Sequence, residues 1–447
     1  MEMLSALDAT FIYLESEHSP MTIGGVYVID ANDTPESFSY ESWYSLVESR
    51  LKLSEVFRRR LVETLLDLSF PYWIRDPDFD LRRHLPCISL PEPGGMTELM
   101  QMAAETWNQM LDREHPLWDI TYVTGLNNIP GISKDSFALI TRVHHAAVDS
   151  KASTEMMTAL LDMTPEPREV GGADHWEPEE FPSALGVIGR SWSRTGQKAV
   201  DLAGFVGKVA VDAVKLRGDK ELGKIEPPPR LLSAPTSFFN QPINSARTFW
   251  GKNFEFERIR AIRKAVSGVT VNDVVLAICA GGLRKYLLEK GELPGKPLVA
   301  MAPISVRGEE EGVGNQVSAM LVSLATDIDD ALARLTHIRA NTQRSKVHAS
   351  ALPANKITDF LPSETLAAAA RVYTRTRFGG HHRPFFNVTI TNVPGPPMPL
   401  YAAGARIHSA FGMAPILDGL GLILVVVSYD GRISIGISSC EQIVPDP

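Results

Sequence analysis

The sequence predicts an α/β fold divided into two domains, and three observations support this prediction. With 447 residues, the chain is longer than one hydrophobic core usually fills. Apolar, β-branched runs typical of strands alternate with runs of helical periodicity, both early and late in the chain. Between these regions, a stretch rich in proline, glycine and glutamate interrupts the alternation. We therefore expect domains at residues 1–163 and 241–447, joined by a linker at residues 164–240.

The first domain is predicted to alternate strands with helices. GGVYVID (24–30) and FALITRV (137–143) have the β-branched, apolar composition of strands. Residues 96–111 carry apolar side chains at helical spacing. SKASTEMMTALLDM (150–163) does the same, and Asp149 or Ser150 is a suitable residue to cap that helix.

The linker contains a predicted basic helix at residues 183–217. The preceding TPEPREVGGADHWEPEEFP is loop-like in composition, and the prolines of EPPPR follow the helix. Its six basic side chains outnumber its two acidic ones, which suits binding to an anionic membrane surface. The alternative is an interdomain helix that packs its apolar face on the core, and its several glycines weaken it in isolation.

The second domain is predicted to resume the α/β pattern. VNDVVLAICAGGLRKYLLEKG (271–291) predicts a long helix, and PLVAMAPISV (297–306) predicts a strand. LGLILVVVSYDGRISIGISS (420–439) predicts a hairpin, because Asp430-Gly431 supplies the positive φ angles of a tight turn.

Composition and charge argue against several classes of protein. A net charge of −9 at pH 7 is unsuited to nucleic-acid binding, which needs a concentrated basic surface. The three cysteines, Cys87, Cys279 and Cys440, have neither disulfide nor metal-ligand spacing. The longest apolar run is far shorter than the roughly 20 residues of a membrane span, and the acidic N-terminus is unlike a secretory signal. A cytoplasmic protein is expected.

The stretch VHHAAVDS (143–150) is the strongest candidate for catalytic chemistry. Successive side chains of a strand face opposite sides, so only one of His144 and His145 can point into a cleft, and the other is structural. A histidine with a carboxylate four residues later can act as an oriented general base. Two alternatives remain: satisfied polar groups with a helix cap, and a metal site, for which His381-His382 is the only other histidine pair. The chain has no GxSxG, Walker or GxGxxG motif, which favours a histidine acting without a covalent intermediate.

VHHAAVDS resembles the HHxxxDG signature of coenzyme A-dependent acyltransferases and condensation domains. Further segments, in the same order along most of the chain, resemble the wax ester synthase/diacylglycerol acyltransferase family. These segments are LSALDATFIYLE, PMTIGGVYVID, FRRRLV, DPDFDLRRH, HPLWDI, TVNDVVLA, APISVR, ITNVPGP and SYDG.

The resemblance implies a fold and an activity. The fold would be two chloramphenicol acetyltransferase-like domains, with mixed sheets flanked by helices and a channel at their interface. The activity would be transfer of a fatty acyl group from acyl-CoA to diacylglycerol or a long-chain alcohol, at a membrane surface or lipid inclusion. No cofactor is implied besides the acyl-CoA substrate.

The resemblance also implies roles for individual residues. His145 would be the base, beside His144, and Asp149 would hold the site's geometry, with Arg307 as its candidate ion-pair partner. Asn272 matches a motif associated with activity and would position substrate or stabilise an oxyanion. Asn392 would shape the channel or a crossover segment. Pro116, Leu117 and Trp118 match an element that either contacts substrate or forms a packed core turn.

One departure from the family pattern leaves a second function open. Ser150 stands where the motif has glycine, and serine adds a side chain where glycine would permit close approach. If that position only begins a helix, serine is harmless. If the thioester passes against it, the chain would be a paralogue that binds acyl-CoA or lipid with little turnover. Condensation between carrier-protein thioesters is a third, less supported option.

Overall fold

The computed structural model describes residues 1–34, 38–64, 69–148, 150–179, 234–305, 317–349, 363–380 and 383–447. Most elements expected from the sequence are present, including the two N-terminal strands, the long helix of the second half and the hairpin. The helices expected at residues 96–111 and 150–163 end earlier, at Trp107 and Leu160. The basic helix expected at residues 183–217 lies outside the described residues.

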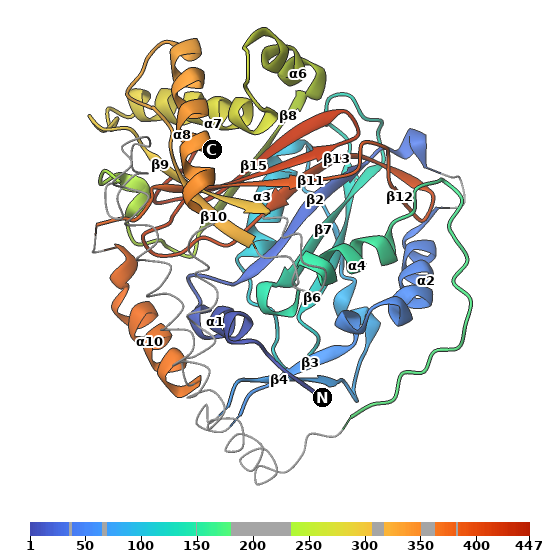
Figure 1. Ribbon diagram of the computed structural model, residues 1–447. Coiled ribbons are helices and arrows are strands. Elements are labelled where there is room, and N and C mark those ends of the chain that lie inside the picture. Colours follow the sequence, from blue (N-terminus) through green and yellow to red (C-terminus); the bar gives the residue numbers. More distant parts are fainter. Residues whose placement is uncertain are drawn as a thin grey trace.

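The first sheet has the strand order β12-β13-β2-β7-β6-β5 (Figure 1). Its neighbours pair antiparallel except β5 and β6, which run parallel, so the sheet is mixed. The strands are β2 (Thr22–Ile29), β5 (Cys87–Ser89), β6 (Trp118–Leu126), β7 (Ser136–His144), β12 (Tyr401–Ala402) and β13 (Ala405–Met413).

The second sheet has the strand order β10-β9-β11-β14-β15-β8, with parallel pairing of β11 to both β9 and β14. The Asp430-Gly431 turn joins β14 to β15, and both turn residues have positive φ, 42° and 74°. The strands are β8 (Arg247–Glu255), β9 (Val299–Ser305), β10 (Val317–Ser323), β11 (Val388–Pro394), β14 (Ile423–Tyr429) and β15 (Arg432–Cys440). A small third sheet joins β1 (Glu2–Met3), β4 (Tyr72–Arg75) and β3 (Arg59–Val62).

Helices and short 3₁₀ turns surround the sheets. The helix α10 from the second half packs beside α1, and its Ala367 and Ala370 are buried in the core of the first half (Figure 1). The α-helices are α1 (Ala6–Leu14), α2 (Tyr40–Arg50), α3 (Met96–Trp107), α4 (Ser150–Leu160), α6 (Phe256–Ala265), α7 (Val271–Glu289), α8 (Ala331–Ala349) and α10 (Ser363–Thr376). The 3₁₀ turns are η1 (Ala31–Asp33), η2 (Leu51–Leu53), η3 (Glu55–Phe57), η5 (Leu81–His84), η6 (His145–Ala147), η7 (Phe238–Asn240) and η8 (Phe378–Gly380).

Two strands from the second half of the chain, β12 and β13, join the first sheet. After β11, the prolines of the TNVPGP segment lead the chain out of the second sheet and into β12 and β13 of the first. There β13 pairs with β2, and Phe411 lies opposite Val26. This arrangement departs from the predicted division at residue 240, because the first sheet includes residues assigned to the second domain. Asn392 lies in β11, directly before this crossover, and its role there stays a prediction.

Glycines allow β13 to lie close against the second sheet. A Cβ atom added at Gly436 of β15 would lie 2.1 Å from the carbonyl oxygen of Gly412 on β13, a distance that no side chain tolerates. Beside this crossing, Phe411, Phe249 and residues of α3 form an apolar cluster between the sheets. The crossing therefore fixes one half of the molecule against the other.

Candidate active site

The histidine pair lies where β7 ends and η6 begins. The backbone N–H of His144 donates to the Leu117 carbonyl at 2.9 Å, and that of His145 donates to the Met21 carbonyl at 2.7 Å. The two residues are thus held by different neighbouring segments. As expected from strand geometry, their side chains have different surroundings.

The His144 side chain is fully buried and faces a carboxylate. Its Nδ1 accepts a hydrogen bond from the Ala146 N–H at 3.0 Å, so Nδ1 carries no proton. The other ring nitrogen, Nε2, lies 3.4 Å from Glu15 Oε1. Arg113 donates to Glu15 Oε2 through Nε at 3.0 Å and Nη2 at 2.8 Å. Burial raises the pKa of Glu15, but His144 and Arg113 lower it by more, so the carboxylate is ionised.

The His145 ring is half-buried and stacks on Phe11 of α1, with ring centroids 4.0 Å apart and an angle of 13° between the planes. Burial lowers the pKa of His145 below its ordinary 6.5; an interaction with its own backbone raises it, and the nearby His144 lowers it. The imidazole is therefore neutral at neutral pH and able to accept a proton. Of the two histidines, His145 has the properties of a base.

The segment HPLWDI supports the histidines from the core. Leu117 and Trp118 are each 1% exposed, and Trp118 Nε1 donates to the Phe57 carbonyl at 2.9 Å. Pro116 bridges to Arg60 of β3. These contacts are those of a packed core turn, one of the two alternatives open for Pro116, Leu117 and Trp118; contact with substrate stays a prediction.

A third histidine, His84, lies behind Trp118. It is buried between the rings of Phe79 and Trp118, and its Nδ1 donates to the Trp118 carbonyl at 2.7 Å. Burial lowers the pKa of His84, with smaller opposing contributions from that hydrogen bond and from Asp119. This residue is thus a neutral core histidine.

The FRRRLV segment is linked directly to the motif that contains the histidines. Arg59 Nη2 donates to the carbonyl of Ala147 at 2.8 Å. Arg58 forms a bidentate pair with Asp174, at 2.6 and 2.8 Å, and stacks over Trp176. These contacts anchor η6 and the chain that follows α4.

Asn272 and Asn392, predicted from separate motifs, meet in the structure. Asn392 Nδ2 lies 3.4 Å from Asn272 Oδ1, at the start of α7 and near the end of β11. The adjacent Asp273 forms a capping box with Thr270, and its Oδ1 accepts from the Thr342 hydroxyl at 2.6 Å. Asp273 therefore caps its helix, and the neighbouring Asn272 is partly exposed.

Several predicted residues lie outside the described part of the chain: Asp149, Arg307, and the pair His381-His382. Ser150 begins α4, and its backbone is helical there, which a serine adopts without strain. Among the described residues, no group of three or more His, Cys, Asp or Glu side chains could hold a metal ion.

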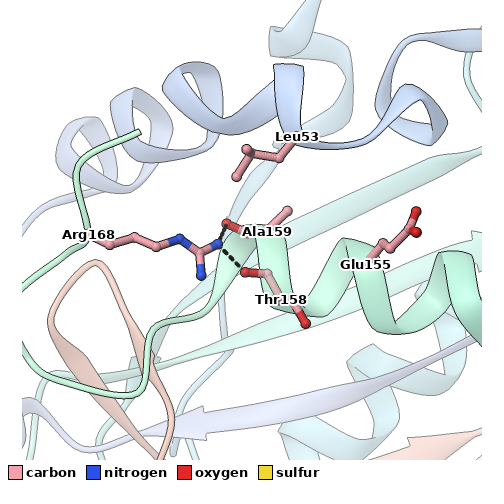
Figure 2. A pocket seen from close by; sticks show the side chains of 5 residues that line it. All are labelled: Leu53, Glu155, Thr158, Ala159 and Arg168. Carbon is pink, nitrogen blue, oxygen red and sulfur yellow. Dashed lines mark hydrogen bonds between the residues drawn. The ribbon is translucent and has the colours of Figure 1, made fainter. Parts of the chain in front are cut away.

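A shallow depression of about 320 Å³ lies at the C-terminal end of α4, away from its histidine-bearing end. Its lining residues are Leu53, Glu155, Thr158, Ala159 and Arg168 (Figure 2). Figure 2 shows Arg168 pointing toward the helix, where it donates to the carbonyls of Thr158 and Ala159. The arginine caps α4, and the depression contains none of the predicted site residues.

The structure adds four residues to the site that sequence reasoning did not single out: Phe11, Glu15, Arg59 and Arg113. The segments LSALDATFIYLE and FRRRLV, already matched to the family, contain Phe11, Glu15 and Arg59. That match was the one signal in the sequence that could have pointed to these three residues. Arg113 lies just before HPLWDI, and nothing in its local sequence indicates its ion pair.

Comparison with known proteins identifies the family to which these features belong. Residues 4–275 match the wax ester synthase/diacylglycerol acyltransferase catalytic domain, and residues 313–447 match the C-terminal domain of the same family. A putative diacylglycerol O-acyltransferase of Mycobacterium tuberculosis (strain CDC 1551 / Oshkosh) is 32% identical over 453 residues, covering 100% of this chain and 87% of the relative.

Two solved structures show the same fold. The wax ester synthase/diacylglycerol acyltransferase from Marinobacter aquaeolei VT8 superposes with a TM-score of 0.68 at 29% identity, covering 99% of this chain and 94% of the other. The starter condensation domain of rhizomide synthetase superposes with a TM-score of 0.51 at 14% identity, covering 99% and 89%, which shows the fold alone. The predicted α/β class with mixed, helix-flanked sheets is confirmed.

Proposed function

The chain belongs to the wax ester synthase/diacylglycerol acyltransferase family and is an O-acyltransferase, and we propose that His145 is the general base of its reaction. The substrates follow from the family: a fatty acyl-CoA as donor, and diacylglycerol or a long-chain alcohol as acceptor. The single observation that most supports this role is the neutral, half-buried His145 ring stacked on Phe11 beside a fully buried His144.

One base suffices for the chemistry. An alcohol ionises about as reluctantly as water, with a pKa of ~15.7, whereas a thiol ionises near roughly 8.5. The attacking hydroxyl therefore needs help and the leaving thiolate hardly does. His145 takes the hydroxyl proton while the oxygen forms a bond to the thioester carbonyl carbon. The carbon–sulfur bond then breaks, and the proton passes to the departing CoA sulfur.

Asn272 and Asn392 form a second part of the proposed site. The amide oxygen of Asn272 faces the Asn392 Nδ2, so the Asn272 NH₂ group is turned to donate elsewhere. Such a donor suits an acceptor hydroxyl or a developing oxyanion. Asp149 and Arg307 retain their predicted roles, as the organiser of the site and its ion-pair partner.

The alternative of a binding paralogue with little turnover is not favoured. It depended on a serine obstructing the motif position usually held by glycine, and α4 already begins at Ser150 with helical backbone. The relatives over the whole length of the chain are named as acyltransferases.

The enzyme is further proposed to work in the cytoplasm, peripherally on the inner membrane or on lipid inclusions. Among the described residues, no helix is long and apolar enough to cross a membrane. Its acceptors reside in lipid, and the basic segment at residues 183–217 has the composition of a helix that binds anionic lipid.

A liposome pelleting assay tests the membrane proposal with two charge-matched variants. Reversing three linker charges should abolish binding to anionic vesicles, whereas reversing three exposed charges on α6 should not. Equal binding of both variants to the vesicles would exclude the linker as the segment that binds the membrane. The linker variant changes Arg190, Arg194 and Lys198 to Glu, and the α6 variant changes Arg258, Arg260 and Arg263 to Glu.

The catalytic proposal is tested by release of CoA thiol from palmitoyl-CoA, with dioleoylglycerol or hexadecanol as acceptor and the lipid products identified by chromatography. His145→Ala should lose about 10²- to 10⁴-fold in acceptor-dependent turnover. His337→Ala, an exposed histidine on α8, is the matched control and should behave as wild type. The acid limb of kcat/KM should lie below pH 6.5, because the pKa of His145 is lowered. Turnover retained in His145→Ala refutes the proposed base.

A further inference from the structure

We infer that Glu15 is a positioning residue for His145, acting through His144 and Met21. This inference rests on the proposed role of His145 as base. Glu15 is the C-cap of α1, where the backbone turns from helical to extended conformation, with a ψ of 136°. Its carboxylate is fully buried, although the residue ends a helix near the surface.

One carboxylate oxygen organises the backbone on both sides of His145. Glu15 Oε1 lies 3.4 Å from His144 Nε2 and 3.5 Å from the backbone nitrogen of Met21. Met21 in turn accepts the His145 N–H through its carbonyl, and His144 Nδ1 accepts the N–H of Ala146, the next residue in the chain. Two of the contacts that hold the loop carrying the base therefore involve Glu15, in addition to those from Leu117 and Arg59.

The other oxygen of Glu15 is neutralised and immobilised by Arg113. The guanidinium donates twice to Oε2 and once to the Ile12 carbonyl on α1. On its outer side, Arg113 also pairs with Glu63, whose side chain is 48% exposed. The same helix places Phe11 against the His145 ring. Helix α1 therefore contacts the histidine pair twice, through Phe11 at His145 and through Glu15 at His144.

Only a side chain that accepts hydrogen bonds at both of its terminal atoms satisfies this environment. The neighbours of Glu15 are all donors: the Arg113 guanidinium, the Met21 N–H and the protonated Nε2 of His144. A glutamine has the same shape, but its NH₂ group must face either Arg113 or His144. Either orientation sets donor against donor, so His144 loses its fixed tautomer or Arg113 loses its partner.

Two double variants distinguish a positioning role of Glu15 from simple structural support. Glu15→Gln with Arg113→Met keeps an acceptor for His144, because the NH₂ group then faces an apolar side chain. Glu15→Leu with Arg113→Met removes the acceptor. Neither variant leaves a buried charge unpaired, so both should unfold at similar temperatures.

The expected result is a kcat at least about 10-fold lower in the leucine pair than in the glutamine pair, with KM for palmitoyl-CoA changed by less than about threefold. Equal kcat values in the two pairs overturn the inference. Should either pair fail to fold, Glu15→Leu alone decides, since it removes the acceptor from His144 while Arg113 keeps its pair with Glu63. Its kcat should fall at least about 10-fold, and a value within about threefold of wild type contradicts the proposed role.

Glu63→Gln is the matched control, because it removes a carboxylate from Arg113 without touching His144, and its kcat should equal that of wild type. His145→Ala separates the two proposals. If it retains turnover, the proposed base is wrong whatever the Glu15 variants do. If it is inactive while all Glu15 variants turn over normally, only the positioning role fails.

Discussion

The buried arginine Arg50 supports the C-terminal end of α4 together with Arg168, and replacing Arg50 should cost much of the protein's stability. Arg50 is 1% exposed. Its Nη2 lies 2.7 Å from Oδ2 of the equally buried Asp162, and its Nη1 donates to the carbonyls of Ala159 and Leu160 at 3.2 and 3.3 Å. Arg50→Met would leave a buried carboxylate and two helix-end carbonyls without this donor.

Removing one partner of a buried ion pair typically costs about 3–5 kcal/mol, and we expect Arg50→Met to fall in that range. Equilibrium urea unfolding, followed by tryptophan fluorescence and circular dichroism, measures the loss. Arg50→Met combined with Asp162→Leu should be less destabilised than Arg50→Met alone, because no buried charge remains unpaired. A loss below about 1 kcal/mol in the single variant, the scale of an exposed pair, would refute the reasoning.

Three further predictions concern stability. The pKa values of His84 and His145 are lowered in the folded state, so the unfolded chain binds more protons below pH 6.5. The urea midpoint should therefore fall as pH decreases through 6.5. A midpoint that rises toward acid pH contradicts this prediction. Thr342→Val removes the hydroxyl that meets the buried Asp273 carboxylate and should cost about 1.5–3 kcal/mol, whereas Thr342→Ser should cost less, as urea unfolding would show. Gly436→Ala should lower the melting temperature through overpacking worth about 1–3 kcal/mol, while the same change at exposed Gly295 should not; equal effects would show that the sheet crossing tolerates a side chain.

Local patterns in the sequence were sufficient to predict elements whose partners lie nearby in the chain. β14 and β15 follow from the apolar segments on either side of Asp430-Gly431, and α7 follows from VNDVVLAICAGGLRKYLLEKG. The different surroundings of His144 and His145 followed from the alternation of side chains along a strand. These features depend only on backbone geometry, which is the same in any protein.

Features that depend on distant contacts could not be predicted in this way. Nothing in the local sequence of β13 indicates that it pairs with β2, because a strand pattern does not encode its partner. The ion pair between Glu15 and Arg113 likewise joins two segments separated by most of the first half. The motif around Trp118 left both substrate contact and a packed core turn open, and only the fold shows that Phe57 and His84 enclose its ring.

The pairing of β13 with β2 has a consequence for how the protein is made. Because Val26 pairs with Phe411, the first sheet cannot be completed until the segment around Phe411 has left the ribosome. Until then, β2 presents an unpaired edge with apolar side chains, the kind of surface on which nascent chains associate with one another. The synthesis of this enzyme therefore includes a long interval in which its first half is translated but the first sheet lacks β13. During that interval the chain depends most on chaperones.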